Sequence, residues 1–193
     1  MIAPNGSQTW HVKYNYTDAN NDFGGRVVCK GSYIYVVGAS YSTQYDMVLI
    51  KYDMSGNVVW TYRVPNFWGG ANAVPLNMVI DNSGNAYIAG TVQGGSTGLD
   101  MSIVRINSDG TIQWGLTFDY GLDDYATSVA LGSGDNLYIT GGSADMGSFG
   151  ASTDMEYTTI AVSKSSGTLL HTAHQNTAAT SIDMAIGVKA DAN

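Results

Sequence analysis

The chain has 193 residues, of which 44 % are hydrophobic and only 12 % are charged, and its formal net charge is −8. This length suffices for one sizeable core, and the low charge content argues against an intrinsically disordered chain. The eight basic residues are scattered and form no phosphate-binding stripe, so we expect no nucleic-acid partner. No apolar run approaches the about 20 residues that cross a bilayer, so we expect no membrane insertion.

Short runs rich in Val, Ile, Tyr and Thr follow one another along the chain and are bounded by Gly, Asn, Asp and Ser, which is typical of β-strands. They recur in sets of four. First strands are expected at 27–29, 76–80, 126–131 and 185–189, and second strands at 33–39, 86–92 and 137–141. Third strands are expected at 47–52, 101–106 and 157–162, and fourth strands at 9–14, 58–64, 112–118 and 168–173. Gly-containing polar turns between these runs predict tight hairpins.

Three tryptophans, Trp10, Trp60 and Trp114, mark the repeat at intervals of 50 and 54 residues. A period of about 50 residues is typical of β-propellers, and four antiparallel strands per repeat correspond to one propeller blade. The sequence therefore predicts an all-β fold without long helices. We expect a single β-propeller segment over 1–193, with repeats at 22–64, 72–118 and 124–174 and extra strands at 9–14 and 185–189. Three full blades and two partial ones correspond to a partial or open propeller.

The repeat resembles the SBBP-type repeats of bacterial β-propeller proteins. The matching pattern is Asp46…Lys51-Tyr52-Asp53…Gly56…Trp60, then Asp81-x-Ser83-Gly84-Asn85-x-Tyr87-Ile88-x-Gly90, and it recurs between Asp100 and Gly141. The resemblance implies a binding scaffold that is secreted or attached to the bacterial cell surface, and it carries no catalytic residues across.

The spacing Gly56-x-x-x-Trp60, repeated as Gly110-x-x-x-Trp114, is similar to the tryptophan-docking motif of quinoprotein dehydrogenase propellers. This second resemblance implies that the tryptophans pack against neighbouring blades, where we expect them to be mostly buried. The pyrroloquinoline quinone site of those enzymes needs vicinal cysteines, whereas Cys29 is alone here. We therefore predict no organic cofactor.

Polar residues stand just before each expected first strand: Asp22, Asn72, Asp124 and Asp183. In a propeller, these positions surround one mouth of the central channel. Converging oxygens there could bind a hard, calcium-like cation or a polar ligand. The alternative is that each residue only caps the loop that enters its blade.

Aromatic residues in or beside the expected loops form the second candidate site. They are Tyr41, Tyr45, Phe67, Trp68, Tyr120, Tyr125 and Phe149. Exposed aromatic side chains beside Asn, Gly and Ser suit a glycan or protein surface. The alternative is that these side chains pack between blades.

Other chemistry-bearing residues favour structural roles. Cys29 lies in an apolar run and is expected to be a small buried strand residue. His171 and His174 are three residues apart on one predicted strand, so they should point to opposite faces rather than form a metal pair. The aspartates in turns are expected to bond to their own backbone, namely Asp53, Asp81, Asp109 and Asp135.

Three functional hypotheses remain open. The first is a non-enzymatic extracellular module that binds a protein or glycan partner through its loop rims. The second is a structural subunit that assembles with copies of itself through unpaired end strands. The third is a hydrolase or lyase that uses the carboxylates of the channel mouth, although no Ser-His-Asp or Cys-His arrangement supports it.

Overall fold

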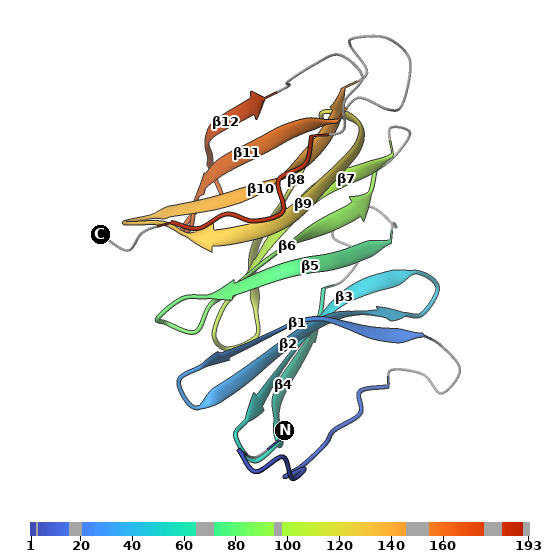
Figure 1. The fold of residues 1–193 in the computed structure, drawn as a ribbon, viewed down its shortest axis with the longest axis vertical. Coiled ribbons are helices and arrows are strands. Elements are labelled where there is room, and N and C mark those ends of the chain that lie inside the picture. Colours follow the sequence, from blue (N-terminus) through green and yellow to red (C-terminus); the bar gives the residue numbers. More distant parts are fainter. Residues whose placement is uncertain are drawn as a thin grey trace.

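The computed structural model describes residues 1–2, 4–15, 21–64, 72–94, 98–145, 155–175 and 183–190. This part of the chain contains twelve β-strands and no helix (Figure 1). Accordingly, no helix capable of crossing a membrane occurs among the described residues.

The strands form three four-stranded antiparallel sheets, which we call blades 1, 2 and 3. Blade 1 consists of β1 (Asp22–Lys30), β2 (Tyr33–Tyr41), β3 (Tyr45–Asp53) and β4 (Val58–Arg63). Blade 2 consists of β5 (Ala73–Ile80), β6 (Ala86–Gln93), β7 (Leu99–Ile106) and β8 (Ile112–Phe118). Blade 3 consists of β9 (Gly121–Leu131), β10 (Asn136–Asp145), β11 (Glu156–Ser163) and β12 (Leu169–Gln175).

The three blades are stacked face to face, with blade 2 in the middle (Figure 1). Their first strands β1, β5 and β9 contact one another in turn, and these strands line a shared groove where a propeller has its central channel. The predicted fold class, an open set of four-stranded propeller blades, is therefore confirmed for the described residues.

Alternation of side chains along each strand explains the stacking. Successive residues of a strand point to opposite faces of its sheet, so the middle blade must be apolar on both faces. In β6, all residues except Gln93 are buried. Tyr35 and Leu49 of blade 1 pack against Ile88 and Val104 of blade 2, and the opposite face of blade 2 packs on blade 3 in the same way.

The hairpin rim, at the end of the blades where the β3–β4, β7–β8 and β11–β12 turns lie, is linked by the repeating tryptophans. The indole nitrogens donate to backbone carbonyls of the next turn: Trp10 to Met54 at 3.0 Å, Trp60 to Ser108 at 3.2 Å and Trp114 to Lys164 at 3.1 Å. Each ring lies against a turn glycine with positive φ, namely Gly56, Gly110 and Gly167, where a Cβ would collide with the indole. The three indoles are half-buried rather than mostly buried.

Three of the four turn aspartates bond to their own turns as predicted. The Asp53 carboxylate accepts the amides of Ser55 and Asn57, Asp81 repeats this arrangement in blade 2, and Asp109 accepts the amide of Thr111. Asp135 differs, because it accepts the Ser165 amide from another turn of blade 3.

Two predicted strands are wrong. Residues 9–14 and 185–189 are described, but neither segment is a β-strand. A strand requires a continuous ladder with a neighbour, and these segments make only separate bonds, such as Trp10 to Met54 and the Ala185 amide to the Gly141 carbonyl.

Cys29 also departs from its prediction, because it is exposed. It pairs with Ile34 on the face of blade 1 that points away from blade 2. The equivalent residue of blade 2, Ile80, is only 4 % exposed because blade 1 covers it. The exposure of Cys29 therefore reflects an outer sheet face without a neighbouring blade among the described residues.

Candidate functional site

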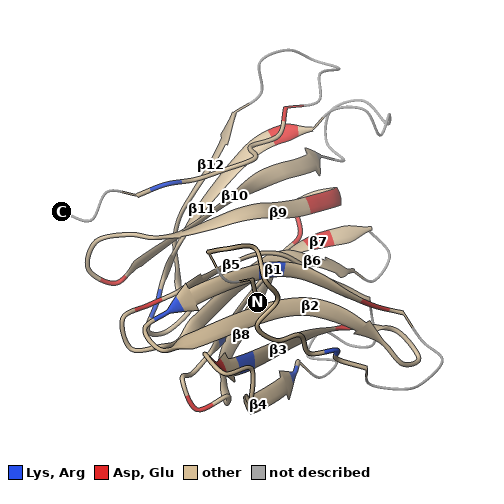
Figure 2. Cartoon of the chain, turned by 60° about the horizontal axis from the view of Figure 1, so that its bottom comes forward, with Lys and Arg blue, Asp and Glu red and all other residues tan. Residues whose placement is uncertain are grey.

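Three carboxylates meet where blades 2 and 3 adjoin. Asp100 is at the start of β7, Asp119 follows β8, and Asp124 is near the start of β9. One oxygen from each lies within 4.8 Å of the others. Figure 2 shows the acidic ends of β7 and β9 on the same side of the molecule. We call this end of the blades, opposite the hairpin rim, the loop rim.

Asp124 is the central member of this carboxylate cluster. It is 0 % exposed. Its Oδ2 accepts the Tyr120 amide at 2.7 Å, whereas its Oδ1 is buried and has no hydrogen-bond partner. Burial raises the pKa of Asp124 to about 7, and the charges of Asp119 and Asp100 add to the rise, although the amides of Tyr120 and Ala144 oppose it. The negative charge of ionised Asp124 therefore needs a stabilising positive group in addition to its present hydrogen-bond donors.

Local backbone geometry fixes the other two carboxylates. Asp100 has a buried Oδ1 without a hydrogen-bond partner, and burial followed by the charge of Asp119 raises its pKa. Its carboxylate rests against Gly94, where an added Cβ would overlap it. The exposed Asp119 accepts the Gly121 amide at 2.9 Å, and Gly121 has the positive φ of 138° that the turn before β9 requires.

Blades can be compared position by position when aligned on the glycine that recurs in their second strands, namely Gly38, Gly90 and Gly141. This alignment makes Asp22, Ala73 and Asp124 equivalent, because they pair with Ser40, Val92 and Ser143, each two residues after that glycine.

Asn72 precedes this position by one residue, so it points to the other face. Its Oδ1 accepts the Tyr45 amide of blade 1 at 2.9 Å, just as Asp123 Oδ1 accepts the Leu99 amide of blade 2 at 2.9 Å. Asn72 therefore joins two blades. The Asp183 amide donates to the Met155 carbonyl. Of the four predicted channel-mouth residues, the structure brings Asp124 into a carboxylate cluster, and its partners there are Asp100 and Asp119, which the sequence did not single out.

The aromatic residues divide into two groups on the loop rim. In blade 1, the ring of Tyr45 packs edge-on against those of Tyr41 at 5.1 Å and Phe23 at 5.5 Å, and Phe23 is 43 % exposed. In blade 3, the Tyr120 ring lies 4.6 Å from the ring of His174.

The hydroxyl of Tyr125, also in blade 3, donates to Asp123 at 3.4 Å. Phe67, Trp68 and Phe149 lie outside the described residues. His174 contacts Thr158 at 2.9 Å, and His171 is exposed on the same strand.

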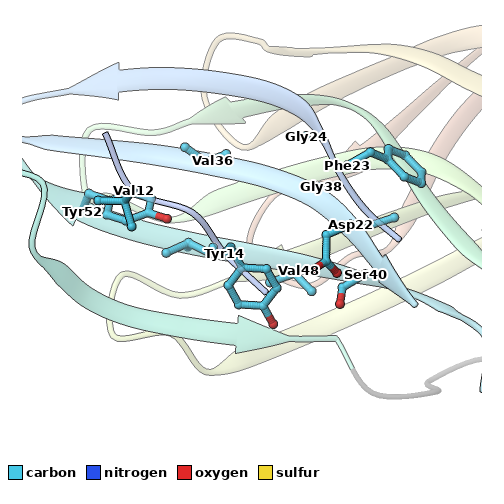
Figure 3. A pocket seen from close by; sticks show the side chains of 12 residues that line it. Val12, Tyr14, Asp22, Phe23, Gly24, Val36, Gly38, Ser40, Val48 and Tyr52 are labelled. Carbon is cyan, nitrogen blue, oxygen red and sulfur yellow. The ribbon is translucent and has the colours of Figure 1, made fainter. Parts of the chain in front are cut away.

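A pocket of about 260 Å³ lies between the N-terminal segment and the outer face of blade 1. Figure 3 shows Val12 and Tyr14 in front of the sheet, with Asp22 and Ser40 at one end of the pocket. Asp22 Oδ1 is buried without a hydrogen-bond partner. Apart from this carboxylate and Ser40, the pocket is mostly apolar.

Comparison with known proteins adds a likeness to solved structures. No family model and no curated protein matches the chain. Among solved structures, the chain is similar to a europium-containing methanol dehydrogenase, with 16 % sequence identity and a TM-score of 0.49 over 77 % of this chain and 24 % of that chain. The chain thus spans about a quarter of the length of that structure. The resemblance to SBBP-type repeats stays a prediction.

Proposed function

We propose that the chain is a non-enzymatic binding module of a secreted or cell-surface protein, and that its loop rim on blade 1 holds a glycan or protein partner. The observation that carries this proposal is the contact cluster of Phe23, Tyr41 and Tyr45. Aromatic side chains present large, rigid apolar surfaces to a partner. The face of a sugar ring, with its C–H groups, is one surface that such rings can cover.

Polar groups beside the aromatic cluster support the same role. Ser42 and Gln44 lie between the two tyrosines in the β2–β3 turn, and Asn72 bonds to the Tyr45 backbone. A partner that packs on the rings would therefore meet amide and hydroxyl groups at its edges. Orientation of a ligand by a few polar groups around an apolar contact is the common arrangement in binding sites.

The carboxylates favour binding over catalysis. Asp124 is fully buried, and a general acid or base must come within hydrogen-bond reach of a substrate. This burial weighs against the hydrolase or lyase hypothesis for Asp124.

Glycan binding can be tested by affinity electrophoresis through soluble β-glucan, xylan, pectin and alginate. We expect retardation by at least one polymer, and at least about a tenfold loss of affinity in Tyr45→Ala and Tyr41→Ala. Tyr33→Ala is the matched control, because Tyr33 is 39 % exposed at the opposite end of β2. Equal retardation of the Tyr41, Tyr45 and Tyr33 variants and wild type would contradict a role for this rim.

A second candidate function is assembly of copies through the outer face of blade 1. Val48, Ile50 and Tyr52 of this face are covered by Trp10 and Tyr14 of the N-terminal segment, and a pocket remains between them. The equivalent face of blade 2 is covered by a whole blade. We propose that a second copy fills this place, so the contact uses a sheet face rather than the strand edges expected from the sequence.

Cys29 reports on this assembly because it is the single cysteine and lies exposed on the same face. If copies assemble there, the reaction of its thiol with a chromogenic disulfide should slow as protein concentration rises, while light scattering shows a larger mass. A constant monomer mass together with an unchanged thiol rate would rule the assembly out.

A further inference from the structure

We propose that Asp100, Asp119 and Asp124 bind a hard divalent cation of the Ca²⁺ type at the loop rim between blades 2 and 3. The cation would connect the third strand of one blade with the first strand of the next. This site is separate from the aromatic cluster of blade 1, so it stands independently of the partner proposed above.

The first step of the argument is an uncompensated buried charge. Asp124 belongs to the carboxylate cluster and is fully buried, and its Oδ1 has no hydrogen-bond partner. Asp100 contributes a second buried, unbonded oxygen. Buried carboxylates are normally paired with a cation or fully hydrogen-bonded, because their desolvation is otherwise too costly.

The second step is that the chain supplies no positive side chain here. All eight Lys and Arg residues lie among the described residues, and neither Asp100 nor Asp124 forms an ion pair with any of them. The segments left out of the description contain neither Lys nor Arg. Compensation must therefore come from a bound cation or from a proton held by the cluster.

The third step is an internal comparison with blade 1. The residue equivalent to Asp100 there is Asp46, which forms an ion pair with Arg63 at 2.7 Å. Arg63 also donates to the hydroxyl of Ser40. The position of Arg63 is occupied by Thr117 in blade 2. The same location in the repeat thus carries a positive side chain in one blade and lacks it in the next.

The negative charge near Asp100 also increases, since Asp124 of the next blade occupies the position that Ala73 holds in the blade after Asp46. Loss of the arginine together with gain of a carboxylate would raise the electrostatic free energy of the carboxylate cluster unless another cation binds there. The two changes therefore point to a metal ion in the role that Arg63 has in blade 1.

Coordination chemistry favours Ca²⁺ over Mg²⁺. Ca²⁺ binds six to eight oxygens at about 2.3–2.6 Å, so opposite oxygens lie up to about 5 Å apart, and one oxygen from each carboxylate here lies within 4.8 Å of the others. Mg²⁺ needs a tighter, nearly octahedral shell and is usually held by only one or two carboxylates. The exposed side of the site, at Asp119, leaves room for water ligands.

The site can be tested by calorimetric unfolding of the full, chelator-treated chain with CaCl₂ from zero to about 10 mM at constant ionic strength. We expect the wild-type Tm to rise by about 5–10 °C once calcium exceeds its Kd about a hundredfold. In Asp124→Asn, isothermal titration should show at least about a tenfold weaker Kd. Asp109→Asn, which changes an exposed turn carboxylate at the hairpin rim of blade 2, should bind calcium like wild type.

A second variant leaves all three carboxylates in place. Gly94→Ala introduces a Cβ that displaces the Asp100 carboxylate, so calcium affinity should fall although the net charge is unchanged. The proposal is overturned if calcium changes neither the Tm nor the heat of titration of wild type. It is also overturned if matched KCl or MgCl₂ reproduces the full shift, or if Asp124→Asn folds and binds calcium like wild type.

Discussion

Blade 1 and blade 2 make the same contacts at the hairpin rim and different contacts at the loop rim. At the hairpin rim, Trp60 and Trp114 each donate to the next blade's turn and lie against its glycine. At the loop rim, Asp46 of blade 1 pairs with Arg63 of the same blade, whereas the equivalent Asp100 of blade 2 belongs to a carboxylate cluster that includes Asp124 of blade 3.

The hairpin-rim contacts are common to the blades, whereas the loop-rim contacts distinguish one blade from another. Apolar alternation and tryptophan docking recur because each blade must bury both faces against neighbours. The loop rim is outside this core, so its charges can change without altering the stacking. Function-specific chemistry should therefore be sought at the loop rim, where equivalent positions differ.

The largest effect on stability is expected from the docking tryptophans, which the blades share. Trp60→Ala and Trp114→Ala should each lower the free energy of unfolding by about 3 kcal/mol, at the low end for aromatic truncation because the indoles are half-buried. Denaturant unfolding measures this, with the neighbouring exposed-residue variants Thr61→Ala and Gln113→Ala as controls. If only one tryptophan variant is destabilised, blades 1 and 2 do not share this contact.

Arg63→Thr makes blade 1 resemble blade 2 at this position. It leaves the nearly buried Asp46 without its partner, and we expect a loss of about 2 kcal/mol, less than for fully buried pairs because both side chains retain some exposure. Arg63→Lys should recover part of the loss, since it retains the charge but not the bonds to Ser40. An unfolding curve unchanged by Arg63→Thr would show that the ion pair does not stabilise blade 1.

A smaller effect is expected at Asp81, a carboxylate satisfied by hydrogen bonds alone. Burial would raise the pKa of Asp81, but bonds from Asn85, Ser83 and Tyr87 outweigh it and the pKa is lowered. The folded state therefore binds the Asp81 proton less readily than the unfolded state. The ionised carboxylate thus contributes to the free energy of unfolding at pH values above its unfolded pKa, and this contribution is lost as the pH falls through the folded pKa.

Asp81→Asn should accordingly cost about 1 kcal/mol at pH 7, allowing for solvent screening of a partly exposed group. The difference between variant and wild type in thermal unfolding should shrink as the pH falls below about 4. A difference that stays constant from pH 7 to pH 3 would show that the carboxylate charge is not involved.

Much of the fold could be predicted because strand alternation and turn glycines are local signals. The strand ends were less predictable. β1 begins at Asp22 rather than at residue 27, because pairing with β2 carries the ladder across Gly24 and a bulge before Arg26. Tertiary pairing thus overrides the low strand propensity of these residues.

The candidate site was only partly predictable. Asp124 was selected because it lies near the start of an inner strand, but Asn72 was grouped with it although the register places the two on opposite faces. Asp100 was visible as the repeat partner of Asp46, and the replacement of Arg63 by Thr117 was the signal that could have marked its position. Asp119 follows β8 without any motif; the β7–β8 register, which pairs Met101 with Phe118, places it beside Asp100, and the stacking of the blades adds Asp124.

The most direct test of the account is the calcium dependence of Tm in Thr117→Arg. Thr117 is exposed, so an arginine has room and should pair with Asp100 as Arg63 pairs with Asp46. Without calcium, the variant should melt at least about 3 °C above wild type, and calcium should raise its Tm by less than about 2 °C. If wild type and Thr117→Arg respond equally to calcium, or if neither responds, the claim that a cation replaces the arginine near Asp100 is contradicted.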